Sequence, residues 1–169
     1  MNRLFIFDFD DTLANYSMYN TWVLKQPIKV FPHIGRTIKG VEEVLDFLTS
    51  RGDALAMLTM NIVLDHDLKW KKLRRVGMER WFHEGNAHFV RRKTPEKILQ
   101  ICGRRRKDRC FMVGNSFNHD VVPSLEAGIH AIHIPRPWFT SWIPRKDPES
   151  DRYHRFSSIF EIIDLYPEL

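Results

Sequence analysis

The sequence predicts an α/β fold built around a mainly parallel sheet. Short apolar runs alternate with helix-length amphipathic stretches along the 169 residues, and this alternation is typical of a parallel sheet whose strands are joined by helices. The chain contains no internal repeat, no low-complexity segment and no linker that would separate domains. With 43% hydrophobic residues, we expect a single globular domain over residues 1–169, with a core that needs no disulfides.

Four apolar runs are predicted to be strands, because a short continuous apolar run suits a strand that is buried on both faces. They are Arg3–Asp8, Ala54–Thr59, Cys110–Val113 and Ile129–Ile134. Helices are expected at residues 41–52, at about 62–76, after Thr94, at 123–127 and within 156–169. The third of these helices has a clear start signal, since Thr94 is a good N-cap and Pro95 suits the first helical position. Ser157 or Ser158 is expected to cap the last one.

Residues 14–39 interrupt the alternation of strands and helices. They carry several aromatic residues together with Pro27, Pro32 and Gly35. Prolines and glycines punctuate regular structure, so this segment predicts a small helix together with a flap or hairpin.

The net charge of +5 comes largely from three basic runs, at residues 68–75, 90–93 and 103–107. Such runs can attract phosphate-bearing or nucleic-acid partners. Solvated helix faces and loops are the more common origin of a charge run, and the general expectation favours them here.

The hydrophobic segments are short and interrupted by charge, so no membrane span is predicted. The chain begins with a strand-like run, without the basic region and apolar helix of a signal peptide, and none is expected. Cys102 and Cys110 do not have a metal-binding spacing. A reducing compartment fits them best, and a cytoplasmic location is expected.

Polar residues follow the apolar runs at the places where open parallel sheets bind ligands, outside the carboxyl ends of their strands. A threonine at a strand end or a lysine before a helix is usually a turn or solvated residue when taken alone. Paired carboxylates at the end of a buried strand need a partner, because an uncompensated buried charge is costly. The combination predicts a site formed by Asp8, Asp10, Thr59, Lys93, Asn115 and Asp120.

These residues lie in four motifs whose order resembles the haloacid dehalogenase (HAD) superfamily, in its phosphatase branch. The run "DFDDTL" at 8–13 is similar to that family's first motif, Asp-x-Asp-x-Thr-Leu/Val after an apolar strand. The second and third motifs match Thr59 in "ALAMLTMN" and Lys93 in "KTPEKI". The fourth matches "VGNSFNHDV" at 113–121, although the family usually has Gly-Asp where this chain has Gly114-Asn115.

The resemblance implies a Rossmann-like three-layer α/β/α sandwich. It also implies an enzyme, a magnesium-dependent phosphatase that hydrolyses a phosphate monoester through an aspartyl-phosphate. Family members often insert a cap domain after the first motif or between the third and fourth. The intervals 13–40 and 93–114 leave little room for one, so we expect little or no cap domain.

The family's residue roles can be carried over to the matching positions. Asp8 is the expected nucleophile, and Asp10 is the expected general acid and base. Mg²⁺ would be held by Asp8, by the backbone carbonyl of Asp10 and by the fourth motif, where the choice between Asn115 and Asp120 stays open.

The remaining expected roles concern the phosphate group. The hydroxyl of Thr59, the backbone amide of Met60 and the side chain of Asn61 would bind its oxygens. Lys93 would balance the charge between the nucleophile and the phosphate. The third acid of the first motif, Asp11, is expected to be a turn or cap residue.

Three other functions compete with the phosphatase. A dehalogenase of this family lacks the second acid of the first motif, which is present here as Asp10. A phospho-acceptor module of the receiver type would carry an aspartate in the stretch "MLTMN", which has none. A nucleic-acid or phosphoprotein-binding module with weak or no catalysis remains the alternative. The expected partner is a phosphorylated substrate, bulky or polyanionic, and the protein is expected to be a monomer or a homodimer.

Overall fold

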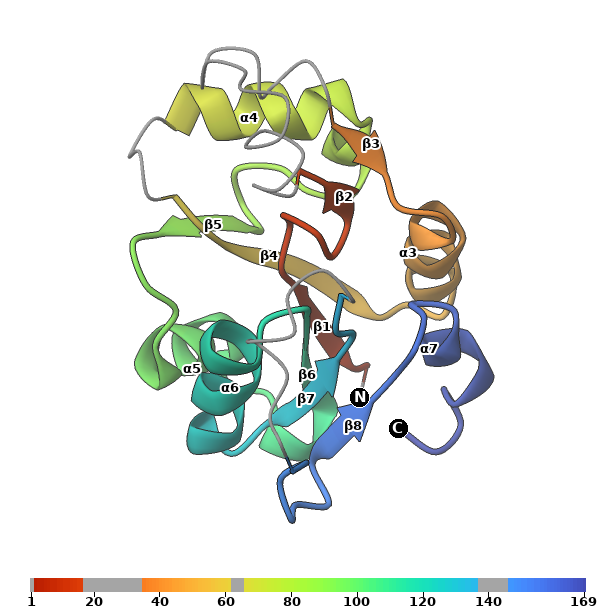
Figure 1. Cartoon of the computed structure of the whole chain (residues 1–169), viewed down its shortest axis with the longest axis vertical. Helices are drawn as coiled ribbons and strands as arrows, with labels where there is room; N and C mark the ends of the chain where they lie inside the picture. The colour runs from red at the N-terminus through yellow and green to blue at the C-terminus, as the bar shows by residue number, and fades with distance from the viewer. Residues whose placement is uncertain (1, 17–34, 62–65, 137–145) are drawn as a thin grey trace.

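The computed structural model describes residues 2–16, 35–61, 66–136 and 146–169. In these residues a six-stranded sheet has the order β5-β4-β1-β6-β7-β8 (Figure 1), and every neighbouring pair is parallel. The strands are β1 (Leu4–Phe7), β4 (Ala54–Met60), β5 (Ala87–Val90), β6 (Cys110–Gly114), β7 (His130–His133) and β8 (Tyr153–Arg155). The predicted parallel α/β sheet is therefore confirmed.

The order of the strands reverses beside β1. The chain passes from β1 to β4 and β5 on one side, and then returns to place β6, β7 and β8 on the other. In open α/β sheets this switch point forms a crevice at the carboxyl ends of the strands, where ligands bind. The ends of β1, β4 and β6 are therefore the place to look for a site.

Helices cover both faces of the sheet, which confirms the three-layer prediction. The helices are α3 (Val41–Ser50), α4 (His66–Arg75), α5 (Pro95–Cys102), α6 (Val122–Ala127) and α7 (Glu161–Asp164). Figure 1 shows α3 and α7 on one side of the sheet and α5 and α6 on the other. None of the described helices is long and apolar enough to cross a membrane.

The two halves of the core follow the alternation of side chains along β1. Phe5 and Phe7 belong to one buried cluster, which also contains the apolar face of α3. Leu4 and Ile6 belong to the other cluster, against α5. Successive residues of a strand point to opposite faces of the sheet, so a strand that is apolar at every position can pack against both helical layers.

The two edge strands, β5 and β8, were not predicted. Each pairs with a single neighbour, and each carries a histidine, His88 or His154, in a short and only partly buried segment. Edge strands lack the continuous apolar run that marks a central strand. The four predicted strands are all present, with ends that differ by at most one residue.

The predicted helices are present with some differences at their ends. Thr94 caps α5 as expected, since its hydroxyl accepts a hydrogen bond from the amide of Lys97 at 3.3 Å. The predicted start near Ile62 lies outside the described residues, and α4 begins at His66. The assigned N-cap of α7 is Phe160 and not a serine, but the Ser158 hydroxyl still accepts a hydrogen bond from the Phe160 amide at 3.2 Å. The carboxylate of Glu161 accepts the Ser157 and Ser158 amides.

A two-stranded antiparallel hairpin stands beside the main sheet and is formed by β2 (Ala14–Asn15) and β3 (Arg36–Thr37). The predicted hairpin is therefore confirmed at its two ends, while the small helix expected in the same segment would fall at residues 17–34, outside the described residues. The hairpin region lies against α4 and the residue that follows it. The hydroxyl of Tyr16, just after β2, donates to the carbonyl of Lys72, and the Thr37 hydroxyl donates to that of Val76, both at 3.1 Å.

Candidate active site

The predicted site residues come together at the carboxyl ends of β1, β4 and β6. Asp8 follows β1, Thr59 is near the end of β4 and Asn115 follows β6. Helix α5 begins just after Lys93, and Asp120 lies in a π-helical turn between β6 and α6. Side-chain hydrogen bonds and ion pairs connect these residues.

Asp8, Lys93 and Asp120 form a buried charged triad. The Lys93 ammonium group donates to Asp8 Oδ1 at 2.6 Å and to Asp120 Oδ1 at 2.5 Å, and all three side chains are almost completely shielded from water. Burial raises the pKa of Asp8 to about 6, with Asp120 and Asp10 acting in the same direction and Lys93 opposing them. Burial also lowers the pKa of Lys93, but the two carboxylates more than offset this and leave it raised.

Both carboxylate oxygens of Asp120 are engaged by the protein itself. While Oδ1 accepts from Lys93, Oδ2 accepts a hydrogen bond from the backbone amide of Ser116 at 2.9 Å. The carboxylate lies so close to Gly114 that a Cβ on that residue would be 2.2 Å from Oδ2. Glycine at position 114 is thus required for the Asp120 side chain to turn back against the end of β6.

Asn115 points instead toward Asp8. The hydroxyl of Thr12 lies 3.4 Å both from Asp8 Oδ2 and from Asn115 Oδ1, so two oxygen acceptors converge on one small volume. The backbone carbonyl of Asn115 is 3.2 Å from His133 Nε2, which connects the segment after β6 to β7. Thr12 was part of the first motif but had no predicted role, and His133 was not predicted at all.

This arrangement fits a small hard cation. Among the described residues no group of three or more His, Cys, Asp or Glu side chains could hold a metal, so the donors would have to include an amide and backbone carbonyls. Asp8 and Asn115 supply such oxygen ligands, which Mg²⁺ prefers, and Mg²⁺ commonly keeps several waters beside one or two carboxylates. Both Asp120 oxygens accept short hydrogen bonds, from Lys93 and from the Ser116 amide, whereas among the described residues Asp8 Oδ2 and Asn115 Oδ1 have only the long 3.4 Å contacts with Thr12. The geometry therefore favours Asn115 over Asp120 as the direct ligand.

Asp10 is bound by two lysines of α4. Lys69 and Lys72 both form salt bridges with its carboxylate, the latter at 3.0 Å. Burial alone raises the pKa of Asp10, but these two ammonium groups outweigh it and hold the pKa below its ordinary value. Lys69 Nζ also lies 3.4 Å from the hydroxyl of Thr59, which connects Asp10 to the end of β4.

The interpretation of residues 68–75 as a solvated helix face was therefore wrong for Lys69 and Lys72. They are 7% and 8% exposed. A signal for this existed in the sequence, because residues 69, 72, 73 and 76 have the i, i+3, i+4, i+7 spacing of a buried helix face. Two apolar residues, Leu73 and Val76, share that face with two lysines, and a lysine at such a position needs a partner.

Apart from the buried Lys93, the other basic residues of the three runs agree with the solvated interpretation. Arg91 and Arg92 are exposed, as is the whole of 104–107. His119, next to Asp120, is exposed. Asp11 is a turn residue as predicted: its backbone has a φ of 62°, and its carboxylate accepts the amide of Tyr16 at 3.1 Å.

Thr59 and Asn61 provide polar groups at the carboxyl end of β4, and Thr59 is connected to Asp10 through Lys69. Both are buried, and the Asn61 side-chain nitrogen has no hydrogen-bond partner among the described residues. A buried amide donor without a partner is costly, and a ligand oxygen would satisfy it. Met60, the third residue expected to bind phosphate, is the last residue of β4 and is partly buried.

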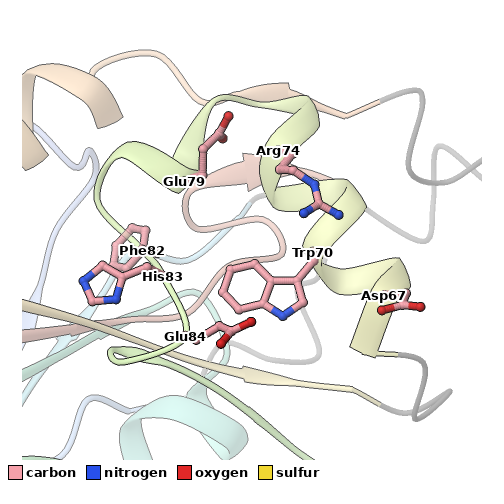
Figure 2. Close-up of a pocket in the computed structure, with 7 residues that line it drawn as sticks. All are labelled: Asp67, Trp70, Arg74, Glu79, Phe82, His83 and Glu84. Atoms are coloured by element: carbon pink, nitrogen blue, oxygen red, sulfur yellow. The ribbon is translucent and has the colours of Figure 1, made fainter.

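A separate recess of about 330 Å³ lies on the opposite face of α4. Figure 2 shows Asp67, Trp70 and Arg74 on the helix, facing the segment that carries Phe82 and His83. None of the predicted site residues lines this recess. It is therefore distinct from the strand-end site.

No protein-family model and no curated protein matches the sequence. Solved structures do match over nearly the whole chain. A haloacid dehalogenase-like family hydrolase from Xanthomonas campestris has a TM-score of 0.72 at 16% identity, covering 92% of this chain and 90% of its own. A Bacillus subtilis protein classed as a HAD-hydrolase and bound to magnesium has a TM-score of 0.71 at 12% identity, covering 97% and 98%.

A third match is a HAD phosphatase from Thermococcus onnurineus, with a TM-score of 0.65 at 15% identity and 98% of each chain covered. At these identities the likeness concerns the fold. It agrees with the fold implied by the four sequence motifs, including the small room left for a cap. The chain has the fold of the haloacid dehalogenase-like hydrolases.

Proposed function

We propose that this protein is a magnesium-dependent phosphatase that hydrolyses a phosphate monoester through an aspartyl-phosphate on Asp8. The observation that carries the proposal is the buried Asp8 carboxylate, with Lys93 at one oxygen and the Thr12–Asn115 pair at the other. Phosphoryl transfer needs a positioned nucleophile and neutralisation of the phosphate charge. The surroundings of Asp8 supply both.

In the first step an oxygen of Asp8 forms a bond to phosphorus while the bond from phosphorus to the substrate oxygen breaks. Asp10 donates its proton to that leaving oxygen. In the second step Asp10 accepts a proton from water, and the water oxygen attacks phosphorus. The bond to Asp8 breaks, which releases inorganic phosphate and restores both side chains.

The proton transfer requires Asp10 to be protonated, although Lys69 and Lys72 favour its ionised form. Thr59 contacts Lys69, so a phosphate bound at Thr59 would compete with Asp10 for that ammonium group. This competition would raise the pKa of Asp10 when substrate is present. Asn61 would donate its side-chain N–H to the same phosphate.

Asp8 and Asn115 would hold Mg²⁺, together with the backbone carbonyl of Asp10. When bound, the ion would neutralise charge on the phosphate and on the nearby carboxylates. Support for this assignment comes from the oxygen donors at the site and from the magnesium-bound Bacillus subtilis neighbour. The Thermococcus onnurineus neighbour, a phosphatase by name, supports the reaction class.

The proposed function is tested by measuring phosphate release from a panel of phosphate esters, with Mg²⁺ or with EDTA. We expect release that depends on Mg²⁺, and a transient covalent label from radioactive substrate that hydroxylamine removes, as it does from acyl phosphates. Absence of Mg²⁺-dependent release from every ester would refute the enzyme assignment. Salt-sensitive oligonucleotide binding without turnover would favour the alternative binding module instead.

The pKa of Asp8 predicts how Mg²⁺ stabilisation depends on pH. Since the pKa is raised to about 6, Asp8 is ionised at pH 7.5 and protonated at pH 5. A metal binds the ionised carboxylate, so saturating Mg²⁺ is expected to raise the Tm above pH 6 and to lose this effect as the pH falls through 6. Thermal melts with Mg²⁺ and with EDTA from pH 5 to 8 measure the difference, and an increase in Tm that persists at pH 5 would exclude Asp8 as the ligand.

A further inference from the structure

The reaction proposed above uses Asp8, Asp10 and Lys93, but it leaves two buried lysines without a dedicated role. Lys69 and Lys72 lie on the face of α4 that turns toward the strand ends, and they are 7% and 8% exposed. Lysine is almost never fully buried unless it is paired, and a solvent-facing position on the same helix would cost nothing. Their burial therefore calls for an explanation at the site itself.

Both ammonium groups converge on Asp10. They share the Asp10 carboxylate, whose side chain is still 34% exposed. Lys69 also reaches the Thr59 hydroxyl at 3.4 Å. Lys72 lies over the ring of Tyr16, 4.3 Å from its centroid. The two positive charges are thus fixed in place beside a carboxylate that is still partly exposed to solvent.

The two halves of the site have opposite charge compositions among the described residues. Around Lys93, one ammonium group faces two carboxylates, Asp8 and Asp120. Around Asp10, two ammonium groups face its carboxylate. The neighbouring Asp11 carboxylate also attracts Lys72, and Arg136 lies beside it, so three cationic groups there face two carboxylates. The first half suits a cation. The second half suits an anion, because an anionic group placed there gains attraction from two ammonium groups already in position.

We propose that Lys69 and Lys72 form a second anion subsite, which selects phosphate monoesters whose leaving group carries a further phosphate or carboxylate. This inference rests on the proposed function, and it narrows the substrate to a doubly anionic class. The scissile phosphate lies at Asp8 and Thr59, and Lys69 borders that position. Lys72 lies one helical turn further along α4 and is placed to meet the second anionic group.

Two matched pairs of substrates test the subsite. Glycerol 3-phosphate and 3-phosphoglycerate differ by a carboxylate, while thymidine 5′-phosphate and thymidine 3′,5′-bisphosphate differ by a phosphate. We expect the wild type to show at least a tenfold higher kcat/KM for the doubly anionic member of one pair. The pair that shows the preference identifies the second group as a carboxylate or a phosphate.

The ratio of kcat/KM for the doubly anionic member to that for the singly anionic member should fall close to one in Lys72→Met, mainly through a higher KM for the doubly anionic substrate. Lys72→Arg should restore part of this ratio. Lys71→Met is the matched control, because Lys71 is the exposed neighbour on the same helix, and it should leave the ratio unchanged. If Lys72 only oriented Asp10, its loss would lower kcat/KM for both members equally and preserve the ratio. Thermal melts confirm that each variant is folded.

The outcomes separate the subsite from the proposed function. If the wild type turns over the substrates with a kcat/KM ratio near one, or if the preference is unchanged in Lys72→Met, the subsite is overturned and the phosphatase assignment is unaffected. Absence of all turnover would overturn the phosphatase, and the subsite is then decided by calorimetric binding of each substrate pair to the wild type. Tenfold tighter binding of a doubly anionic member, lost in Lys72→Met, would support it, and equal binding would overturn it.

Discussion

Replacing Asp8 by asparagine is expected to lower kcat/KM by about a thousandfold or more while leaving the protein as stable as before, or more stable. The amide cannot form the aspartyl-phosphate, and loss of a covalent nucleophile typically costs several orders of magnitude. The stability follows from the pKa of Asp8, which burial raises to about 6. A carboxyl group with a raised pKa destabilises the folded state when ionised, so a neutral amide at pH 7.5 removes an unfavourable charge.

The matched control is Asp11→Asn, three residues along the chain. Burial, followed by the charge of Asp10, raises the pKa of Asp11 to about 6 as well. Its carboxylate, however, accepts a hydrogen bond from the Tyr16 amide, a role that an asparagine oxygen can keep. Asp11→Asn should retain activity within a few-fold, as measured by phosphate release and thermal melts in parallel. Comparable activity in the two variants would eliminate Asp8 as the nucleophile.

The central part of the fold could be predicted from the sequence because its strands are buried on both faces. The run from Leu4 to Phe7 packs against helices on both sides of the sheet, and such a strand must be apolar at every position. The edge strands β5 and β8 carry no such requirement. Their pairing depends on the tertiary arrangement of the sheet, which short segments such as Ala87–Val90 do not encode by themselves.

In the candidate site, too, some features could be predicted from local sequence and others depend on the tertiary structure. Positions at strand ends were predictable, because the carboxyl ends of parallel strands meet at one edge of a sheet. The partners of Asp10 were not predicted, since charge runs are usually solvated and the basic residues of this run do not by their type distinguish Lys69 and Lys72 from their exposed neighbours. The apolar residues Leu73 and Val76 did carry that information, through their shared helical face.

The choice between Asn115 and Asp120 shows where sequence reasoning stops for a physical reason. Both residues follow β6, and either side chain could supply an oxygen to a cation. What distinguishes them is the turn that directs Asp120 back onto the Ser116 amide and onto Lys93. That turn requires the space left by Gly114, and it becomes visible only when the backbone path is known.

Replacing Lys93 by methionine is expected to lower the free energy of unfolding by about 3–5 kcal/mol at pH 7 in EDTA, which is typical when one partner of a buried ion pair is removed. Methionine fills a similar volume but leaves Asp8 and Asp120 facing each other without the ammonium group that contacts both. Phosphate release should be lost as well, because the charge balance at the nucleophile is disturbed. Urea unfolding of the wild type and the variant measures the difference.

The pH dependence identifies the cause of this destabilisation. Without Lys93 the pKa of Asp8 should rise further above about 6, so the folded variant takes up protons at a higher pH than the unfolded chain does. The free energy of unfolding of Lys93→Met should therefore increase toward that of the wild type as the pH falls from 7 to 5. At pH 7, adding Asp120→Asn to Lys93→Met should restore part of the lost stability. Lys97→Met on α5, where the ammonium group bonds only to exposed Gln100 among the described residues, should change little at any pH. If the free energy of unfolding of Lys93→Met were lower than that of the wild type by the same amount at pH 5 and pH 7, the cause would be lost packing and not two uncompensated carboxylates.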